Sequence, residues 1–284
     1  MHVAAIWQYP VKSMIGGQVE SAEISATRMI GDRAWALRDE VRGGIRGAKK
    51  IGELMQFAAR FTGPVDGPSD GAVEITLPDG STVGSGDADV NARLSKALDH
   101  EVTLWPLQPA TDLDHYRRGP SDNPDDMMAE LRQVFGRTDD EPLPDLSIFP
   151  PEILDFESTP GTYLDAYPLL IMTTSALRSL RRAVPEANPD VRRFRPNLLV
   201  DTADEPGHPE FEWSGKRLRV GEVELEIGAG CPRCVMVTRE IDATLPQDRT
   251  ILRHIVRDLG QNVGVYATAV APGIVRAGDV VEQI

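Results

Sequence analysis

Short stretches in which apolar and polar residues alternate, each bounded by turn residues, dominate both ends of this sequence. At residues 223–227, Val223, Leu225 and Ile227 alternate with glutamates, which is typical of a sheet that faces water on one side. Residues 77–82, LPDGST, supply turn chemistry between two such runs and predict a hairpin. We expect strands or hairpins at residues 2–11, 18–25, 33–39, 72–83, 101–107, 197–201, 216–229, 234–240, 263–270 and 277–284.

Four stretches have the apolar spacing of amphipathic helices instead: 87–100, 127–135, 174–184 and 249–260. In residues 174–184, Leu177, Leu180 and Val184 fall on one face. We expect Thr174 to cap this helix and Asp87 to cap the first one. The pattern therefore predicts an α+β fold that is mainly β, a mixed barrel with helices on its flanks.

Length and local composition predict the division into domains. A chain of 284 residues suits two ordinary domains. The segment from 108 to 160 is rich in Pro, Asp and Glu, and holds one short helix. We expect a β-rich domain over residues 1–107, an acidic, Pro-rich connector over 108–160, and a second domain over 161–284.

Composition and charge limit the possible partners. The hydrophobic content of 41% and charged content of 26% are those of a globular protein. The formal net charge of −14 argues against nucleic acid, which is bound through a basic face. No stretch is apolar for the roughly 20 residues of a membrane helix, and the start lacks the features of a signal peptide. We therefore expect a cytoplasmic protein that binds neither nucleic acid nor a membrane.

The two cysteines, Cys231 and Cys234, have the spacing of a metal knuckle or a redox dithiol. A zinc knuckle needs four ligands, and the sequence holds no second CxxC. A thioredoxin-type pair begins a helix, whereas this pair precedes VMVTRE, which predicts a strand. One reading leaves both cysteines as apolar residues of a packed strand. The other follows from the Gly- and Pro-rich GAGCPRC, which fixes a turn and delivers Cys234 to the first position of a strand, where its side chain points into a cleft as readily as into a core. A lone thiolate in such a place suits a soft metal that brings its other ligands.

Four motifs in a fixed order resemble a known family. They are YPVKSM at 9–14, GDRAWALRDE at 31–40, RRFRPNLLVD at 192–201 and CPRCVMVT at 231–238. Together with the ending VRAGDVV, they resemble MOSC proteins with an N-terminal MOSC β-barrel domain, the group of the mitochondrial amidoxime-reducing component and its bacterial relatives. The resemblance implies a β-barrel-like first domain and a C-terminal MOSC β-barrel with flanking helices. It does not extend to the acidic connector.

The resemblance further implies a molybdenum cofactor, a pterin that carries a metal-chelating dithiolene and a terminal phosphate. The thiolate of Cys234 is then the metal ligand and the catalytic residue. Cations and hydroxyls would hold the phosphate, and the Asn197 amide would read the pterin edge. Lys49 stands in where the family has an arginine. The implied cofactor-binding set is Lys12, Ser13, Arg33, Lys49, Thr173, Thr174, Ser175, Arg195, Asn197, Cys231 and Arg233.

Each of these residues also has an ordinary structural interpretation. Lys12 could be a solvated lysine, and Arg33 could pair with Asp32 or stack on Trp35. Arg195 could belong to an exposed basic face, and Asn197 could be a turn residue after Pro196. A single shared ligand explains the co-occurrence of the four motifs better than separate accidents do.

The resemblance implies an oxidoreductase that reduces small N-hydroxylated compounds such as amidoximes. Because the sequence has only two cysteines and no ferredoxin-like tail, we expect electrons from a separate electron-transfer protein. Two alternatives stay open: a sulfur carrier or cofactor-handling protein with a Cys234 persulfide, and a non-enzymatic module that binds an anionic small molecule.

Overall fold

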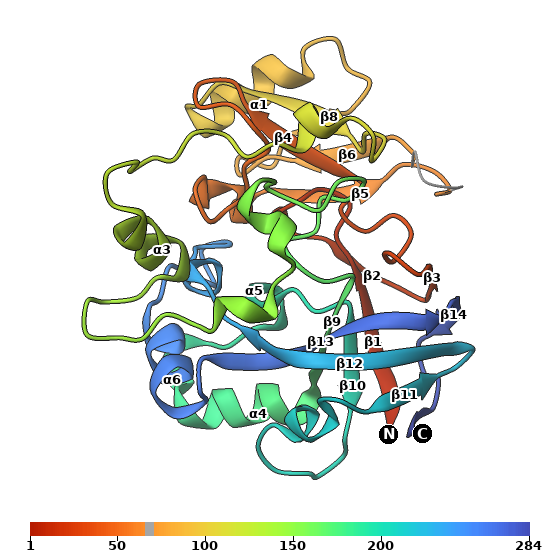
Figure 1. The fold of residues 1–284 in the computed structure, drawn as a ribbon. Helices are drawn as coiled ribbons and strands as arrows, with labels where there is room; N and C mark the ends of the chain where they lie inside the picture. Colours follow the sequence, from red (N-terminus) through yellow and green to blue (C-terminus); the bar gives the residue numbers. More distant parts are fainter. Residues whose placement is uncertain (66–70) are drawn as a thin grey trace.

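An eight-stranded mixed sheet forms the larger part of the fold (Figure 1). The computed structural model describes residues 1–65 and 71–284. Strands β9 and β10 are parallel, and the other pairs of this sheet are antiparallel. The strand order is β15 (Val281–Gln283), β11 (Arg217–Val220), β12 (Val223–Pro232), β13 (Asn262–Ala271), β9 (Leu169–Thr173), β10 (Leu198–Asp201), β1 (His2–Gln8) and β2 (Gly17–Val19).

The first and last parts of the chain meet in this sheet. His2 forms an antiparallel bridge with Val280, and the Val281 amide donates to the carbonyl oxygen of Met1 at 3.0 Å. The sheet thus curves around a core that includes Ile6 and Val265. Strand β1 belongs to the expected first domain but pairs with β10 of the expected second domain. The division at residues 107 and 160 stays a prediction.

Three smaller sheets complete the β-structure. Two of them share a core with α1 (Val90–Leu98), whose Leu94 and Leu98 pack beside Ile75; they lie in the upper half of Figure 1. The pairings are β4 (Trp35–Asp39) with β8 (Val102–Pro106), β5 (Ala58–Phe61) with β6 (Val73–Thr76) and β7 (Thr82–Gly84), and β3 (Ser21–Ile24) with β14 (Gly273–Arg276).

The remaining helices flank the sheets, as the amphipathic patterns predict. Leu180 of α4 and Ile255 of α6 belong to a third core beneath the large sheet. The α-helices are α2 (Leu113–Tyr116), α3 (Met127–Phe135), α4 (Thr174–Ala183), α5 (Val191–Phe194) and α6 (Thr250–Asp258). The 3-10 helices are η1 (Gly52–Gln56), η2 (Leu146–Ile148), η3 (Pro151–Leu154), η4 (Pro185–Ala187), η5 (Pro209–Trp213) and η6 (Val235–Thr238). The expected α+β class, mainly β, is confirmed.

The strand expected at residues 234–240 is wrong. The ladder of β12 ends where Pro232 pairs with Asn262, and the chain then turns into η6. Consecutive side chains of this turn enter different cores, since Met236 packs with the N-terminal cluster and Val237 with the cluster of α4 and α6. Hydrogen bonds between residues three apart close this turn in place of a strand ladder: the Val237 amide donates to the carbonyl oxygen of Cys234 at 3.4 Å, and the Arg239 amide donates to that of Met236 at 3.1 Å.

Two expected helix caps are also wrong by one or two residues. The side chain that caps α4 is Thr173, whose Oγ1 accepts from the Ala176 amide at 3.0 Å. Asp87 precedes α1 by too much, and its carboxylate instead accepts from the Gly84 amide. Within the described parts of the chain, every helix is too short or too polar to cross a bilayer.

Candidate functional site

A cavity of about 750 Å³ gathers side chains from segments far apart in the sequence. Lys12 and Ser13 follow β1, Arg33 precedes β4, and Lys49 lies before η1. From the second half of the chain come Asp165, Arg195, Asn197, Cys231, Arg233 and Cys234. The structure thus brings together all of the expected site residues except Thr173, Thr174 and Ser175.

Lys12 is a deeply enclosed cation of the cavity. Its side chain is only 4% exposed, which contradicts the reading of a solvated lysine. The ammonium donates to the carbonyl oxygen of Tyr163 at 2.9 Å, to Ser158 Oγ at 3.2 Å and to Asp165 Oδ1 at 2.5 Å. All three N–H donors of Lys12 are therefore in use. Lys49 pairs with the other oxygen of Asp165 at 3.4 Å.

Asp165 is the point at which the charges of the cavity converge. Its side chain is 46% exposed, and although desolvation in the cavity favours a raised pKa for its carboxyl, the ammonium groups of Lys12 and Lys49, and then Arg33, outweigh desolvation and lower the pKa. Burial likewise favours a lower pKa for Lys49, yet Asp165 and then Cys234 raise it. The Cys234 thiol thus lies within electrostatic reach of the same cluster.

Two arginines lie against one tyrosine ring at the opposite end of the cluster. The guanidinium carbons of Arg33 and Arg195 are 4.8 and 4.2 Å from the centre of the Tyr9 ring. Burial and then mutual repulsion from Arg195 lower the pKa of Arg33 to about 9. Holding two like charges this close is costly unless a negative group lies between or beside them. The sequence left open that Arg33 stacks on Trp35. In the structure it stacks on Tyr9 instead.

Asp32 holds the groups at this end of the cavity in place. Its carboxylate, 1% exposed, accepts from the Tyr9 amide at 2.9 Å, from Asn197 Nδ2 at 3.0 Å and from Arg33. Asn197 Oδ1 in turn accepts from the Leu170 amide at 3.1 Å. The Asn197 amide therefore keeps one donor and one acceptor site for a ligand.

Several cavity residues have backbone conformations that L side chains rarely adopt. Ser13, Arg33 and Arg195 have φ angles of 68°, 49° and 58°. Such conformations cost about 1–3 kcal/mol each and persist only where the surroundings hold them. At Ser13 the support is a close approach: Oγ accepts from the Ala48 amide at 2.9 Å, and a Cβ on the adjoining Gly47 would lie 2.5 Å from it. The concentration of strained residues on one cavity is typical of a binding site.

The two cysteines have different surroundings. Cys231 is 5% exposed, and burial raises the pKa of its thiol above 9.0. Cys234 is a half-buried free thiol that directly precedes η6, and it lines the cavity. Of the two sulfurs, only Cys234 combines partial exposure with nearby cations, which is the setting of a reactive or metal-binding thiolate.

Arg233 is occupied by the protein itself. It donates to the carbonyl oxygen of Val263 from Nε at 2.8 Å and from Nη2 at 2.5 Å, and to that of Phe194 from Nη1 at 2.9 Å. Its side chain therefore fixes the turn that carries Cys234 against β13 and α5. We assign it a positioning role rather than direct contact with a ligand.

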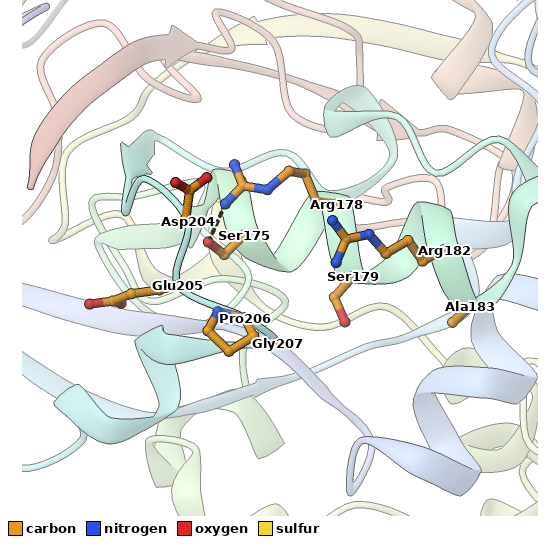
Figure 2. Close-up of a pocket in the computed structure, with 9 residues that line it drawn as sticks. All are labelled: Ser175, Arg178, Ser179, Arg182, Ala183, Asp204, Glu205, Pro206 and Gly207. Carbon is orange, nitrogen blue, oxygen red and sulfur yellow. Dashed lines mark hydrogen bonds between the residues drawn. The ribbon is translucent and has the colours of Figure 1, made fainter.

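The three hydroxyls at the start of α4 do not reach the cavity. Thr173 Oγ1 donates to Glu210 at 2.6 Å, Thr174 Oγ1 donates to Asp201 at 3.0 Å, and Ser175 lies 2.7 Å from Thr202 Oγ1. Figure 2 shows Ser175 beside Arg178 in a separate pocket of about 330 Å³. Because α4 runs beneath the sheet, its N-terminus faces η5 and the loop after β10, and the expectation that these residues bind the cofactor is not supported.

Sequence reasoning missed several residues of the site. Asp32 was considered only as a partner of Arg33, and Tyr9 was not considered, although both fall within the quoted motifs. Asp165 lies in DAYP, directly after the connector, and no local pattern marks it. The only sequence signal for Asp165 would have been the need to balance Lys12 and Lys49.

Comparison with known proteins gives matches at both ends of the chain. The MOSC domain model matches residues 159–282, and the MOSC N-terminal beta barrel domain model matches residues 1–112. Mitochondrial amidoxime reducing component 2 of Macaca fascicularis is 28% identical, over 99% of this chain and 83% of that protein. The Homo sapiens counterpart is 31% identical, over 43% of this chain and 38% of its own length.

Solved structures resemble this chain more distantly. The crystal structure of the YuaD protein from Bacillus subtilis covers 98% of this chain and 92% of its own, at 11% identity and a TM-score of 0.44. That of YiiM from Escherichia coli covers 42% of this chain and 54% of its own, at 17% identity and a TM-score of 0.31.

Proposed function

This chain belongs to the MOSC domain family with an N-terminal MOSC β-barrel domain, and from that membership we propose that it binds a molybdenum cofactor and reduces N-hydroxylated compounds. The observation that carries the proposal is the convergence of Lys12, Lys49, Arg33, Arg195 and a free thiol on one cavity. Separate structural roles would not require these groups to share a cavity.

The donor set fits such a cofactor. Lys12 and Lys49 are already paired with Asp165, so we assign the phosphate to Arg33 and Arg195. Each arginine uses one N–H on a protein oxygen, of Asp32 and of Met14 respectively, and keeps further donors for a bidentate grip. An anion beside them would also relieve the repulsion that lowers the pKa of Arg33. The carboxylate of Asp165 and the amide of Asn197 keep hydrogen-bonding capacity that suits the N–H donors and the acceptors of a pterin ring.

Cys234 is the residue that we assign to the metal. A thiolate is a soft ligand, and Cys234 is a free, partly exposed thiol that lines the cavity together with Lys49. When bound, the cofactor supplies two-electron oxo-transfer chemistry, while the protein orients the substrate and excludes water. Cys231, more buried and without a role in this scheme, supports the turn.

The reaction that follows breaks the N–O bond of an amidoxime, takes up two electrons and two protons, and releases an amidine and water. The electrons come from a separate electron-transfer protein. Amidoxime reduction is the activity that the names of the matched relatives state.

The test is turnover of benzamidoxime by protein purified from a host that makes the cofactor, with reduced methyl viologen as electron donor. We expect benzamidine formation by the wild type and none by Cys234→Ser at an unchanged unfolding midpoint. Wild-type protein that contains molybdenum and pterin yet forms no benzamidine would favour a storage or sensing role instead.

A further inference from the structure

One wall of the cavity comes from the segment that neither family model covers. Residues 113–158 lie between the two matched regions. Side chains from this segment line the cavity. The apolar ones are Met127, Leu131, Val134, Phe135, Leu146 and Phe149.

Helix α3 presents a single apolar face to the cavity. Met127, Leu131, Val134 and Phe135 are spaced at i, i+4, i+7 and i+8, and therefore fall on one side of the helix. Met128 on the same helix does not line the cavity and is 53% exposed. Met127 is 71% exposed although it borders the cavity, so apolar surface is available there for a ligand.

The C-terminal end of α3 rests on the turn that carries Cys234. Helix α3 packs against η6, and a Cβ on Gly136 would lie 3.3 Å from the backbone of Val235. The next residue, Arg137, donates from Nη2 to the carbonyl oxygen of Arg233 at 3.1 Å. The apolar wall is therefore adjacent to the thiol that we assign to the metal.

Ion pairs hold the other end of the wall and cancel its charge. Lys50 bridges Glu130 of α3 at 2.7 Å and Asp122 at 2.8 Å, and Arg46 also pairs with Asp122 at 2.8 Å. Two acidic groups of the connector thus meet two basic groups of the N-terminal part. Arg118, which also lines the cavity, pairs with Glu157 at 2.5 Å, so the wall offers a ligand apolar contact beside charges that are compensated.

We propose that residues 118–151 form a substrate wall that selects neutral N-hydroxylated compounds with an apolar, aromatic body over small polar ones. This inference rests on the proposed function and adds the substrate class to it. The reactive N–OH group lies toward Cys234, and the body of the substrate lies against α3. Helix α3 holds the apolar surface of the pocket in place. Loss of contacts with α3 therefore weakens the binding of aromatic substrates and leaves the binding of small ones unchanged.

The test measures binding as well as turnover, with benzamidoxime and acetamidoxime as probes. Calorimetry on the purified protein, whatever its molybdenum content, gives Kd for both compounds, and steady-state kinetics give kcat/KM. We compare wild type with Leu131→Gln, which places an amide on the wall, and with Met128→Gln as the matched control on the same helix. Val134→Thr, which keeps the side-chain shape, is the second wall variant and decides the matter if Leu131→Gln lowers the unfolding midpoint.

We expect wild type to prefer benzamidoxime, and the wall variants to raise its Kd by about 10-fold, since each removes apolar contact from the pocket. Acetamidoxime binding, molybdenum content and the Met128→Gln control should not change. Two results would overturn the proposal: equal Kd values of the two compounds for wild type, or equal effects of Leu131→Gln and Met128→Gln on the Kd of benzamidoxime. Failure of the proposed function has a different signature, namely no molybdenum and no turnover of either compound, and the two Kd values test the wall even then.

Discussion

Replacement of Asp32 by asparagine probes how the cavity is held in shape. Asp32 Oδ1 accepts from the Tyr9 amide, and an asparagine oxygen could keep that bond. The new Nδ2 would then face two donors, Asn197 Nδ2 and the Arg33 guanidinium, where Oδ2 now accepts from both. The substitution therefore places the new Nδ2 donor against the N–H donors of Asn197 and Arg33, and it leaves the Arg33 cation without its carboxylate partner.

The expected cost follows from burial. The Asp32 side chain is fully enclosed and that of Arg33 is 14% exposed, so solvent replaces little of what is lost. Removing one member of a buried ion pair costs about 3–5 kcal/mol. With about 2–4 °C per kcal/mol for a domain of this size class, Tm should fall by roughly 6–20 °C.

The assay is thermal unfolding followed by circular dichroism, with urea unfolding to give the free energy directly. The control is Asp114→Asn, which removes an exposed carboxylate that lies 3.7 Å from Arg117. We expect the control to cost less than about 1 kcal/mol. A loss of that same small size for Asp32→Asn would refute the reasoning that Asp32 holds the cavity together.

The remaining predictions concern the thiols and the phosphate grip. Cys234→Ser should abolish amidoxime reduction and leave the fold intact, whereas Cys231→Ser should weaken it only in part; equal loss from both, measured as kcat/KM, would revive a dithiol mechanism. Iodoacetamide at about pH 8 should alkylate Cys234 first, because burial raises the pKa of the Cys231 thiol above its ordinary value and keeps that thiol protonated at this pH, and peptide mass spectrometry would expose the reverse order. Arg195→Lys should lower the molybdenum content of purified protein because the bidentate grip is lost, and unchanged content would show that Arg195 does not hold the cofactor.

The sequence predicted most of the regular structure where periodicity is strong. The hairpin of β11 and β12 and the helices α4 and α6 follow from apolar spacing alone. Strand β9 was missed because its residues are buried on both faces, so that LLIMT shows no alternation. The turn η6 was mistaken for a strand because three of the four residues of VMVT are β-branched, whereas the ladder of β12 ends at Pro232 and hydrogen bonds between residues three apart close the turn.

The site was predicted in part. The motifs around Lys12, Arg33, Arg195 and Cys234 marked groups that share a cavity, although the neighbouring elements β1, β4, α5 and β12 are far apart in the chain. The hydroxyls of α4 were misplaced because a helix N-terminus attracts anions in general, and sequence cannot tell which side of the sheet it faces. The apolar wall of α3 was not foreseen, since Pro- and Asp-rich flanks made the segment look like a mere connector.

The central claim is that one protein sulfur, that of Cys234, binds molybdenum. X-ray absorption at the molybdenum edge, applied to wild type and to Cys234→Ser, counts the sulfur atoms around the metal. We predict one sulfur fewer in Cys234→Ser and no change in Cys231→Ser. An unchanged sulfur count in Cys234→Ser, or a wild type that carries labile sulfane sulfur on Cys234 and no molybdenum, would contradict the account.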